Sequence, residues 1–283
     1  MNRSKTIRNL WIFSFVALGI GWLGVWLDGR LPDQAAEETL GMAVWLITPL
    51  LLVVVLRTFF GDGWKDAGLR PRLVSQWKWY LVAFLVFPVV TLLSLAVGAL
   101  TGWVDFSPFD AGAYFSTFAM LLGINLLKNV FEESVWRGYL TAKLIGLKIG
   151  DGGIYLLAGM VWGLWHLPYY LEFLPEEAMY TVLPVQKGWF AAIAVVNMLV
   201  WTVLFTELFR LTESVWSVVL LHAVEDAVIN HLVIDGFVVL QSGTEILLSP
   251  ICGILPTLLY LSIGLWLRRM RRRLPAPDST PFQ

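Results

Sequence analysis

Long apolar runs separated by short polar segments dominate the chain from residue 9 to residue 267. A transmembrane helix needs about 20 consecutive, mostly apolar residues. Eight segments fit this length, at residues 9–27, 40–59, 79–101, 112–135, 153–173, 188–209, 214–234 and 246–267. These runs are too long and too uniformly apolar for the alternating strands of a membrane barrel. The pattern therefore predicts an all-α, polytopic membrane helical bundle of about eight transmembrane helices.

Composition supports a membrane protein. Hydrophobic residues make up 58% of the 283 positions and charged residues only 14%, against about 25% charged in a soluble domain. Fifteen tryptophans suit the membrane interface. The single cysteine, Cys252, excludes an intramolecular disulfide and a multi-cysteine metal site. The basic, then apolar N-terminus has no small-residue cleavage site, so we expect it to be retained as the first helix.

Lysine and arginine alternate between the two sides of this span pattern. One set of loops and ends holds sixteen basic residues, and the alternate set holds two, Arg30 and Lys187. The rich set comprises Arg3, Lys5, Arg8, Arg57, Lys65, Arg70, Arg72, Lys78, Lys143, Lys148, Arg210, Arg268, Arg269, Arg271, Arg272 and Arg273. Basic loops stay in the cytoplasm, so the alternation predicts that both termini are cytoplasmic.

Ionisable residues inside the spans gather on three of the eight segments. Each such group costs about 2.5–3.5 kcal/mol on insertion scales, so it needs a functional or structural reason. At about 1.5 Å of rise per residue, the three sets reach a comparable depth, within reach of the cytoplasmic face. We therefore expect them to form one shared site. The ionisable residues are Lys128, Glu132, Glu133 and Arg137, then His166, then His222, Glu225, Asp226 and His231, and the polar Asn230 lies among the last of these.

Helical spacing predicts which of these side chains meet. Residues four apart share a helix face, so we expect Glu133 to pair with Arg137 and His222 with Asp226. Glu132 points about 100° away from Glu133 and is free to face the interior of the bundle.

Plain structural interpretations also exist for several of these groups. Both pairs could be simple intrahelical contacts, and His166 could be a core histidine. Lys128 could neutralise Glu132. Glu225 and His231 suit structural or solvated positions, and His231 lies about half a turn away from His222.

A carboxylate and a histidine that converge in a partly dry pocket can share a water and remove its proton. A second histidine could stabilise the oxyanion that forms when this water attacks a peptide carbonyl. The same groups could instead bind zinc. Other intramembrane hydrolase patterns are absent from the sequence, which contains no HExxH, no GxSG serine with a matching histidine and no GxGD aspartate pair.

Three short motifs resemble those of the CPBP (Abi) family of intramembrane proteases, which includes the CaaX prenyl endopeptidases and bacteriocin-processing or self-immunity proteins. "EESVWR" matches EExxxR, "WGLWH" approximates FxxxH with Trp162 in place of phenylalanine, and "HAVED" matches HxxxN/D. "WKDAGLRP" is similar to the amphipathic segment that often precedes the family's core. The resemblance covers residues 64–234. Outside this core, the apolar runs predict two N-terminal transmembrane helices over 1–63 and a C-terminal one over 235–270. The composition of the basic tail over 271–283 predicts disorder.

The resemblance also implies roles. Glu132 would be the catalytic base and would act with His166 on water, supported by the Glu133–Arg137 pair. His222 and Asp226 would stabilise the intermediate, or His166, His222, Asp226 and Glu132 would hold Zn²⁺; the family is described both as metal-dependent and as metal-free. An ionised Asp226 cannot donate a hydrogen bond to an oxyanion, so it would be protonated, orient His222 or favour a metal.

The function expected from this resemblance is hydrolysis of a peptide bond in a membrane-associated peptide or protein, in the bacterial cytoplasmic (inner) membrane, with the site open to the cytoplasm. Family analogy favours a bacterial peptide or protein over a prenylated substrate. The expected partners are this substrate and the lipid bilayer, not nucleic acid, and the oligomeric state is left open. Two other functions fit the polar cluster: a non-catalytic bacteriocin-immunity or scaffold protein, and a proton-coupled transporter.

Overall fold

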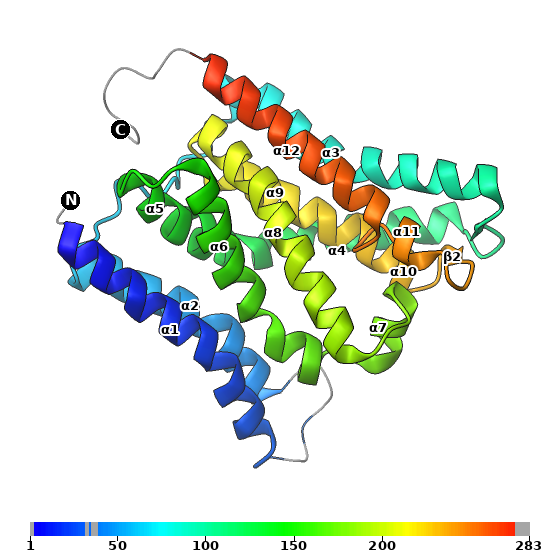
Figure 1. Cartoon of the computed structure of the whole chain (residues 1–283), viewed down its shortest axis with the longest axis horizontal. Coiled ribbons are helices and arrows are strands. Elements are labelled where there is room, and N and C mark those ends of the chain that lie inside the picture. The colour runs from blue at the N-terminus through cyan, green and yellow to red at the C-terminus, as the bar shows by residue number, and fades with distance from the viewer. Residues whose placement is uncertain (1–2, 32–33, 35–38, 275–283) are drawn as a thin grey trace.

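The computed structural model describes residues 3–31, 34 and 39–274, and it is a bundle of helices (Figure 1). Helices α1 (Arg3–Asp28) and α2 (Leu40–Phe59) pack side by side at one edge. Helix α9 (Val215–Glu225) packs against both α3 (Leu73–Thr101) and α4 (Ala111–Val135). Helix α8 (Lys187–Thr212) packs between α6 (Asp151–Trp165) and α12 (Ile254–Arg273). The predicted all-α membrane bundle is confirmed.

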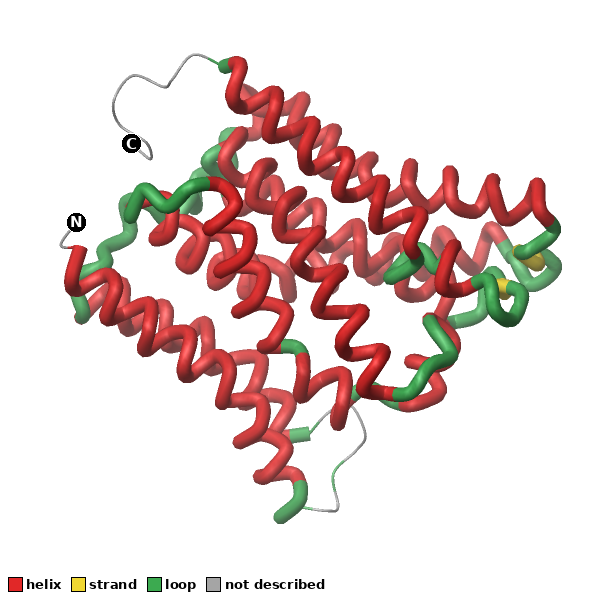
Figure 2. Tube along the Cα trace, viewed as in Figure 1, coloured by secondary structure: helices red, strands yellow, loops and turns green. Residues whose placement is uncertain are grey.

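The remaining elements are short. They are η1 (Trp136–Thr141), α5 (Ala142–Gly146), η2 (Tyr169–Phe173), α7 (Glu176–Val182), η3 (Asp226–Asn230), α10 (His231–Ile234) and α11 (Glu245–Leu248). The three η elements are π-helical. Two two-residue strands, β1 (Val104–Asp105) and β2 (Val239–Leu240), pair antiparallel with Val104 opposite Leu240. Figure 2 shows these strands together at one end of the bundle.

Six helices in the described residues are long and apolar enough to cross a membrane, against the eight that the sequence predicts. Four are α1, α2, α3 and α8, and two are composite, at Ala111–Gly146 and Val215–Ile234. The predicted span at 153–173 is interrupted because α6 ends at Trp165, shortly before Pro168, and a proline disfavours helical geometry at the residue before it. The predicted span at 246–267 is divided into α11 and α12 around Pro250. The count of eight is therefore not confirmed.

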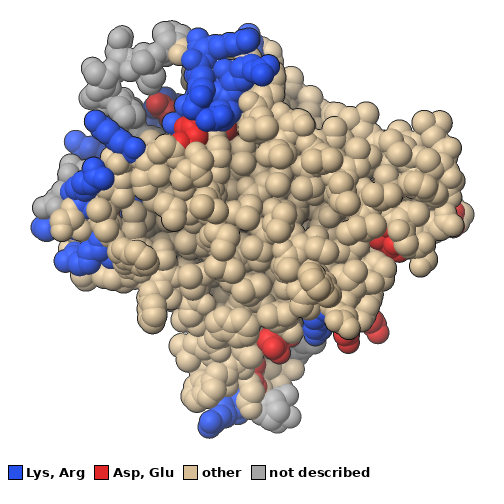
Figure 3. Space-filling model, in the orientation of Figure 1, with Lys and Arg blue, Asp and Glu red and all other residues tan. Residues whose placement is uncertain are grey.

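The two ends of the described chain lie together. The start of α1 and the end of α12 are at the same end of the bundle (Figure 1), where Figure 3 also shows most of the visible lysine and arginine atoms. This arrangement agrees with the predicted alternation of charge, while the cytoplasmic orientation stays a prediction. The predicted division of the chain at residues 63, 234 and 270 also stays a prediction. Helix α12 continues through Arg273, and residues 275–283 of the predicted tail lie outside the described residues.

Ion pairs tie three helices together at this basic end. Asp151, the first residue of α6, pairs with Arg210 of α8 and with Arg268 and Arg272 of α12. Burial alone would raise the pKa of the Asp151 carboxyl. The hydrogen bonds from Arg268 and Arg210 lower this pKa by more than burial raises it, so it lies well below its ordinary value. The Asp151 carboxylate therefore stays charged at any pH near neutrality.

Close approach of two glycines fixes the contact between α1 and α2. A Cβ atom added at Gly24 would lie 2.4 Å from the carbonyl oxygen of Gly41. This separation is far inside van der Waals contact, and the obstacle is backbone that cannot rotate away. In contrast, a Cβ atom added at Gly19, on the same helix, meets nothing within 4 Å.

We predict that Gly24→Ala lowers the thermal unfolding midpoint in detergent. The added methyl must push the two helices apart, and such overpacking costs about 1–3 kcal/mol. The matched variant Gly19→Ala removes a helix-interior glycine without a clash, so its midpoint should stay the same or rise slightly. Equal midpoints for the two variants would contradict the close packing of α1 on α2.

Candidate active site

Each of the three predicted motifs lies next to a π-helical turn. The η1 turn begins three residues after Glu133 and contains Arg137, η2 begins three residues after His166, and η3 begins at Asp226. A π turn holds one more residue than an α turn, and such turns are frequent at functional sites. The widened turns change the direction of the side chains that follow them, which the α-helical spacing used for the sequence could not anticipate.

Glu133 is the centre of the polar contacts. Its Oε1 atom accepts a hydrogen bond from Arg137 Nη1 at 2.9 Å and lies 2.8 Å from His222 Nδ1. The Glu133 side chain has no exposed surface, and that of Arg137 is 1% exposed. The predicted Glu133–Arg137 pair is thus present. The contact with His222 joins it to a helix 89 residues further along the chain.

Two aromatic rings enclose the charged side of Arg137. Its guanidinium carbon lies 3.9 Å from the ring centroid of Trp162 and 4.3 Å from that of Phe205. Cations over aromatic faces are stabilised, most strongly where water is excluded. The aromatic residue that replaces the phenylalanine of the FxxxH motif therefore covers the buried Glu133–Arg137 pair.

His222 does not make the expected hydrogen bond with Asp226. Its Nδ1 atom meets Glu133 instead, and Asp226 accepts hydrogen bonds from Asn129 Nδ2 at 2.7 Å and from Asn230 Nδ2 at 3.2 Å. Lys128 Nζ lies 3.1 Å from Asp226 Oδ2. The helix is regular between the two residues, since the amide of Asp226 donates to the carbonyl oxygen of His222. The partners of Asp226 are therefore set by Lys128 and Asn129 of α4 rather than by its own helix.

Lys128 joins the first and third motifs. Its ammonium group lies between Asp226, at 3.1 Å, and Glu132 Oε1, at 3.9 Å. The expected neutralisation of Glu132 by Lys128 is therefore weaker than the pairing of Lys128 with Asp226. Glu132 is 11% exposed, and its Oε2 atom is buried with no hydrogen-bond partner among the described residues. One oxygen of Glu132 is thus available to a bound molecule.

His166 ends α6 and is oriented by its own helix. Its Nδ1 atom lies 2.8 Å from the carbonyl oxygen of Trp162, and a carbonyl can only accept, so Nδ1 carries the proton. The Nε2 atom is then a hydrogen-bond acceptor. Tyr170 stacks on the imidazole at 5.7 Å between centroids. The Trp162 ring lies 5.9 Å from both His166 and His222, so one indole contacts the two histidines.

Glu225 and His231 have different surroundings. Glu225 is buried and lies beside His222 and Asp226, so a solvated position is excluded. His231 stacks on Tyr114 at 4.5 Å between centroids and joins none of these contacts. Asn129 is a member of the site that the sequence analysis did not name. For Asn129, the signal was its position three residues before Glu132, on the same helix face.

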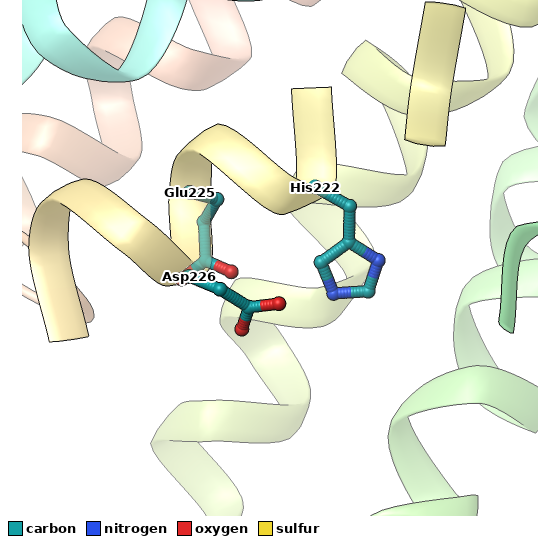
Figure 4. Close-up of side chains that lie close together, drawn as sticks. All are labelled: His222, Glu225 and Asp226. Atoms are coloured by element: carbon teal, nitrogen blue, oxygen red, sulfur yellow. The ribbon is translucent and has the colours of Figure 1, made fainter. Parts of the chain in front are cut away.

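Three side chains lie close enough together to be considered as ligands of a metal ion. One ligand atom from each of His222, Glu225 and Asp226 lies within 4.8 Å of the others, and Figure 4 shows a ring nitrogen of His222 facing the Asp226 carboxylate. Of the predicted zinc ligands, this group includes His222 and Asp226 but not His166 or Glu132. A structural or catalytic zinc takes at least three such donors, but Lys128 already neutralises Asp226. The arrangement therefore fits an ion-paired carboxylate better than a zinc site.

Known proteins share this part of the chain. Residues 114–228, which include all three motifs, match the model of the type II CAAX prenyl endopeptidase Rce1-like family. The chain is also 29% identical over 151 residues to CAAX prenyl protease 2 of Methanococcus maripaludis. The resemblance to the CPBP family is confirmed. The alignment with that relative covers 53% of this chain and 54% of the relative, so the chain matches about half of the relative's length.

We predict that Arg137→Met strongly destabilises the protein, because it removes one partner of a buried ion pair and leaves Glu133 charged. Loss of one partner of such a pair costs about 3–5 kcal/mol. The double variant Glu133→Gln/Arg137→Met should recover part of this loss, since no carboxylate is then left enclosed. Unfolding midpoints in detergent measure both effects, with the exposed Arg269→Met as the control. A double variant less stable than Arg137→Met would contradict the pairing.

Proposed function

We propose that this chain is an intramembrane endopeptidase that hydrolyses a peptide bond in a membrane-associated peptide or protein. The observation that carries the proposal is that Trp162 contacts both His166 and His222, which come from different helices. Glu132 lies on a third helix, its Oε2 atom has no hydrogen-bond partner among the described residues, and it shares Lys128 with Asp226. The match of residues 114–228 to a family of prenyl endopeptidases and the name of the relative support the same chemistry.

In this proposal Glu132 and His166 activate water. The Nε2 atom of His166 accepts a hydrogen bond from the water and orients it toward the scissile carbonyl. As the water oxygen forms a bond to the carbonyl carbon, Glu132 takes the released proton. When the C–N bond breaks, Glu132 gives this proton to the leaving nitrogen, which restores the carboxylate. The free Oε2 atom of Glu132 is suited to this exchange.

His222 stabilises the negative oxygen of the intermediate. Glu133 holds Nδ1 of His222, and a carboxylate accepts only, so Nδ1 carries a proton. In the imidazolium form, Nε2–H donates to the oxyanion, and the charge of Glu133 stabilises this form. Asp226 is ionised, because three donors surround it, so it acts by holding Lys128 and Asn129 beside the reacting groups. In this proposal Asp226 does not contact the oxyanion itself.

An apolar cavity supports a membrane-associated substrate. A space of about 440 Å³ lies between α3, α4 and the helix that follows η3, and Val228, two residues after Asp226, forms part of its wall. Its lining is almost entirely apolar, with Phe84, Leu92, Phe106, Phe115 and Leu232 among its residues. We propose that this cavity receives an apolar group of the substrate next to the reacting centre. We place the protein in the bacterial inner membrane with its basic end, visible in Figure 3, toward the cytoplasm.

We predict that Glu132→Gln and His166→Ala each lower the rate of cleavage of a membrane-peptide library by about 10²-fold or more, the usual range for loss of an acid–base group. The amide cannot take the proton, and alanine cannot orient the water. Both variants should keep the unfolding midpoint of the wild type. Glu177→Gln, on the exposed surface of α7, is the control and should retain the full rate. Full activity of either site variant would contradict the mechanism.

We predict that cleavage survives a zinc chelator. The reason is that Lys128, rather than a metal ion, neutralises Asp226. The measurement combines the metal content of the purified protein by mass spectrometry with the cleavage rate before and after chelation. Stoichiometric zinc together with chelator-sensitive cleavage would overturn this part of the proposal. A wild-type protein that cleaves no member of the library would instead favour the non-catalytic immunity or scaffold function.

A further inference from the structure

A second cavity lies outside the residues of the three motifs, where four candidate spans end. Helix α2 ends at Phe59 and α3 begins at Leu73, while α8 ends at Thr212 and α9 begins at Val215. The segment 60–72 and the link at Glu213 meet at this point and enclose a space of about 460 Å³. Because four spans end here, the cavity is at the level of a membrane surface.

The walls of this cavity carry an excess of positive charge. Lys65, Arg70 and Arg72 line it together with one acid, Glu213. Arg72 pairs with Glu213 at 2.7 Å, so the single acid is already neutralised. Lys65 and Arg70 have no ion-pair or hydrogen-bond partner in the part of the chain that the structure describes. In contrast, the neighbouring cations Arg57 and Lys143 are both paired, with Asp66. Two unpaired cations therefore face the same space.

The backbone around the cavity is held firmly in place. Arg57 donates to the carbonyl oxygen of Gly63 and to Asp66, and Lys143 donates to the carbonyl oxygen of Asp62. On the other side, the amide of Val215 donates to the carbonyl oxygen of Gly68 at 2.8 Å. The positions of the two unpaired cations are thus set by a segment that is anchored at both ends, which reduces the entropy lost when a ligand binds.

Apolar side chains form a collar beside the charged cavity. Trp64 and Leu69 belong to its lining and are both exposed. The first turns of α3 add Leu73, Val74, which is 91% exposed, and Trp77, which is 57% exposed. Exposed tryptophans and aliphatic residues next to basic residues are typical of a surface that lies at the headgroups and upper acyl chains of a bilayer.

We propose that this cavity binds the headgroup of an anionic phospholipid. The phosphate lies between Lys65 and Arg70, and the acyl chains run along the collar of Leu69, Leu73 and Trp77. A soluble anion would leave this apolar collar in water, whereas a lipid covers it. The site is separate from the proposed peptidase chemistry and does not depend on it.

The test measures lipid retention by the full-length protein in a non-ionic detergent, by native mass spectrometry, with phosphatidylglycerol or phosphatidylcholine added. Wild type should retain phosphatidylglycerol in preference to phosphatidylcholine. Lys65→Gln/Arg70→Gln should lower phosphatidylglycerol retention on the order of 10-fold, given the usual contribution of each basic residue near an anionic surface. Both substituted residues are exposed, so the unfolding midpoint should not change.

The matched control is Lys148→Gln/Arg269→Gln, which removes the same charge from two exposed residues outside the cavity and should retain phosphatidylglycerol as the wild type does. Equal losses in both double variants would show a general charge effect and overturn the site. Equal binding of both lipids by the wild type would overturn the headgroup preference. Displacement of phosphatidylglycerol by millimolar inorganic phosphate would assign the cavity to a free anion and overturn the proposal that it binds a lipid.

Discussion

The carboxylate of Glu133 is completely enclosed by protein, and the arrangement of the site depends on how its charge is compensated. An isolated charge in such surroundings costs many kcal/mol, and proteins tolerate it only with partners in good geometry. Arg137 supplies one partner from the same helix, and His222 supplies the other from α9. The aromatic rings of Trp162 and Phe205 then cover Arg137. A single buried charge thus requires α4, α6, α8 and α9 to meet at one point.

Partners on a neighbouring helix decide the contacts of the polar groups on α9. His222 and Asp226 are one regular turn apart, since the amide of Asp226 donates to the carbonyl oxygen of His222, and η3 begins only at Asp226. Lys128 and Asn129 of α4 nevertheless bind Asp226, while His222 stays with Glu133. Two acids of the site therefore have separate sets of partners, which suits separate roles.

The sequence was informative where the physics is local. Spacing within one helix predicted the Glu133–Arg137 pair, and apolar run length predicted the all-helical membrane bundle. Contacts between distant segments, such as Glu133 with His222, leave no trace in local spacing and could not be derived. Spacing also placed His222 and Asp226 on one helix face, and ligand atoms of the two lie within 4.8 Å of each other. Their hydrogen-bond partners come from α4 and could not be derived from the spacing within α9. The predicted spans at 153–173 and 246–267 are not confirmed as continuous helices, because apolar content alone does not reveal the interruptions near Pro168 and at Pro250.

The hydrogen bond from Arg57 to the carbonyl oxygen of Gly138 has a consequence for the register of the site helix. Gly138 lies in η1, directly after Arg137, and five residues later Lys143 binds the same segment 60–72 that Arg57 anchors. Conversion of η1 to a regular α-helix would rotate everything beyond it by about 100° and shift it by about 1.5 Å. Lys143 would then turn away from Asp66. The π-helical pitch of η1 is therefore fixed by its contacts with the segment 60–72, which lies outside the helix.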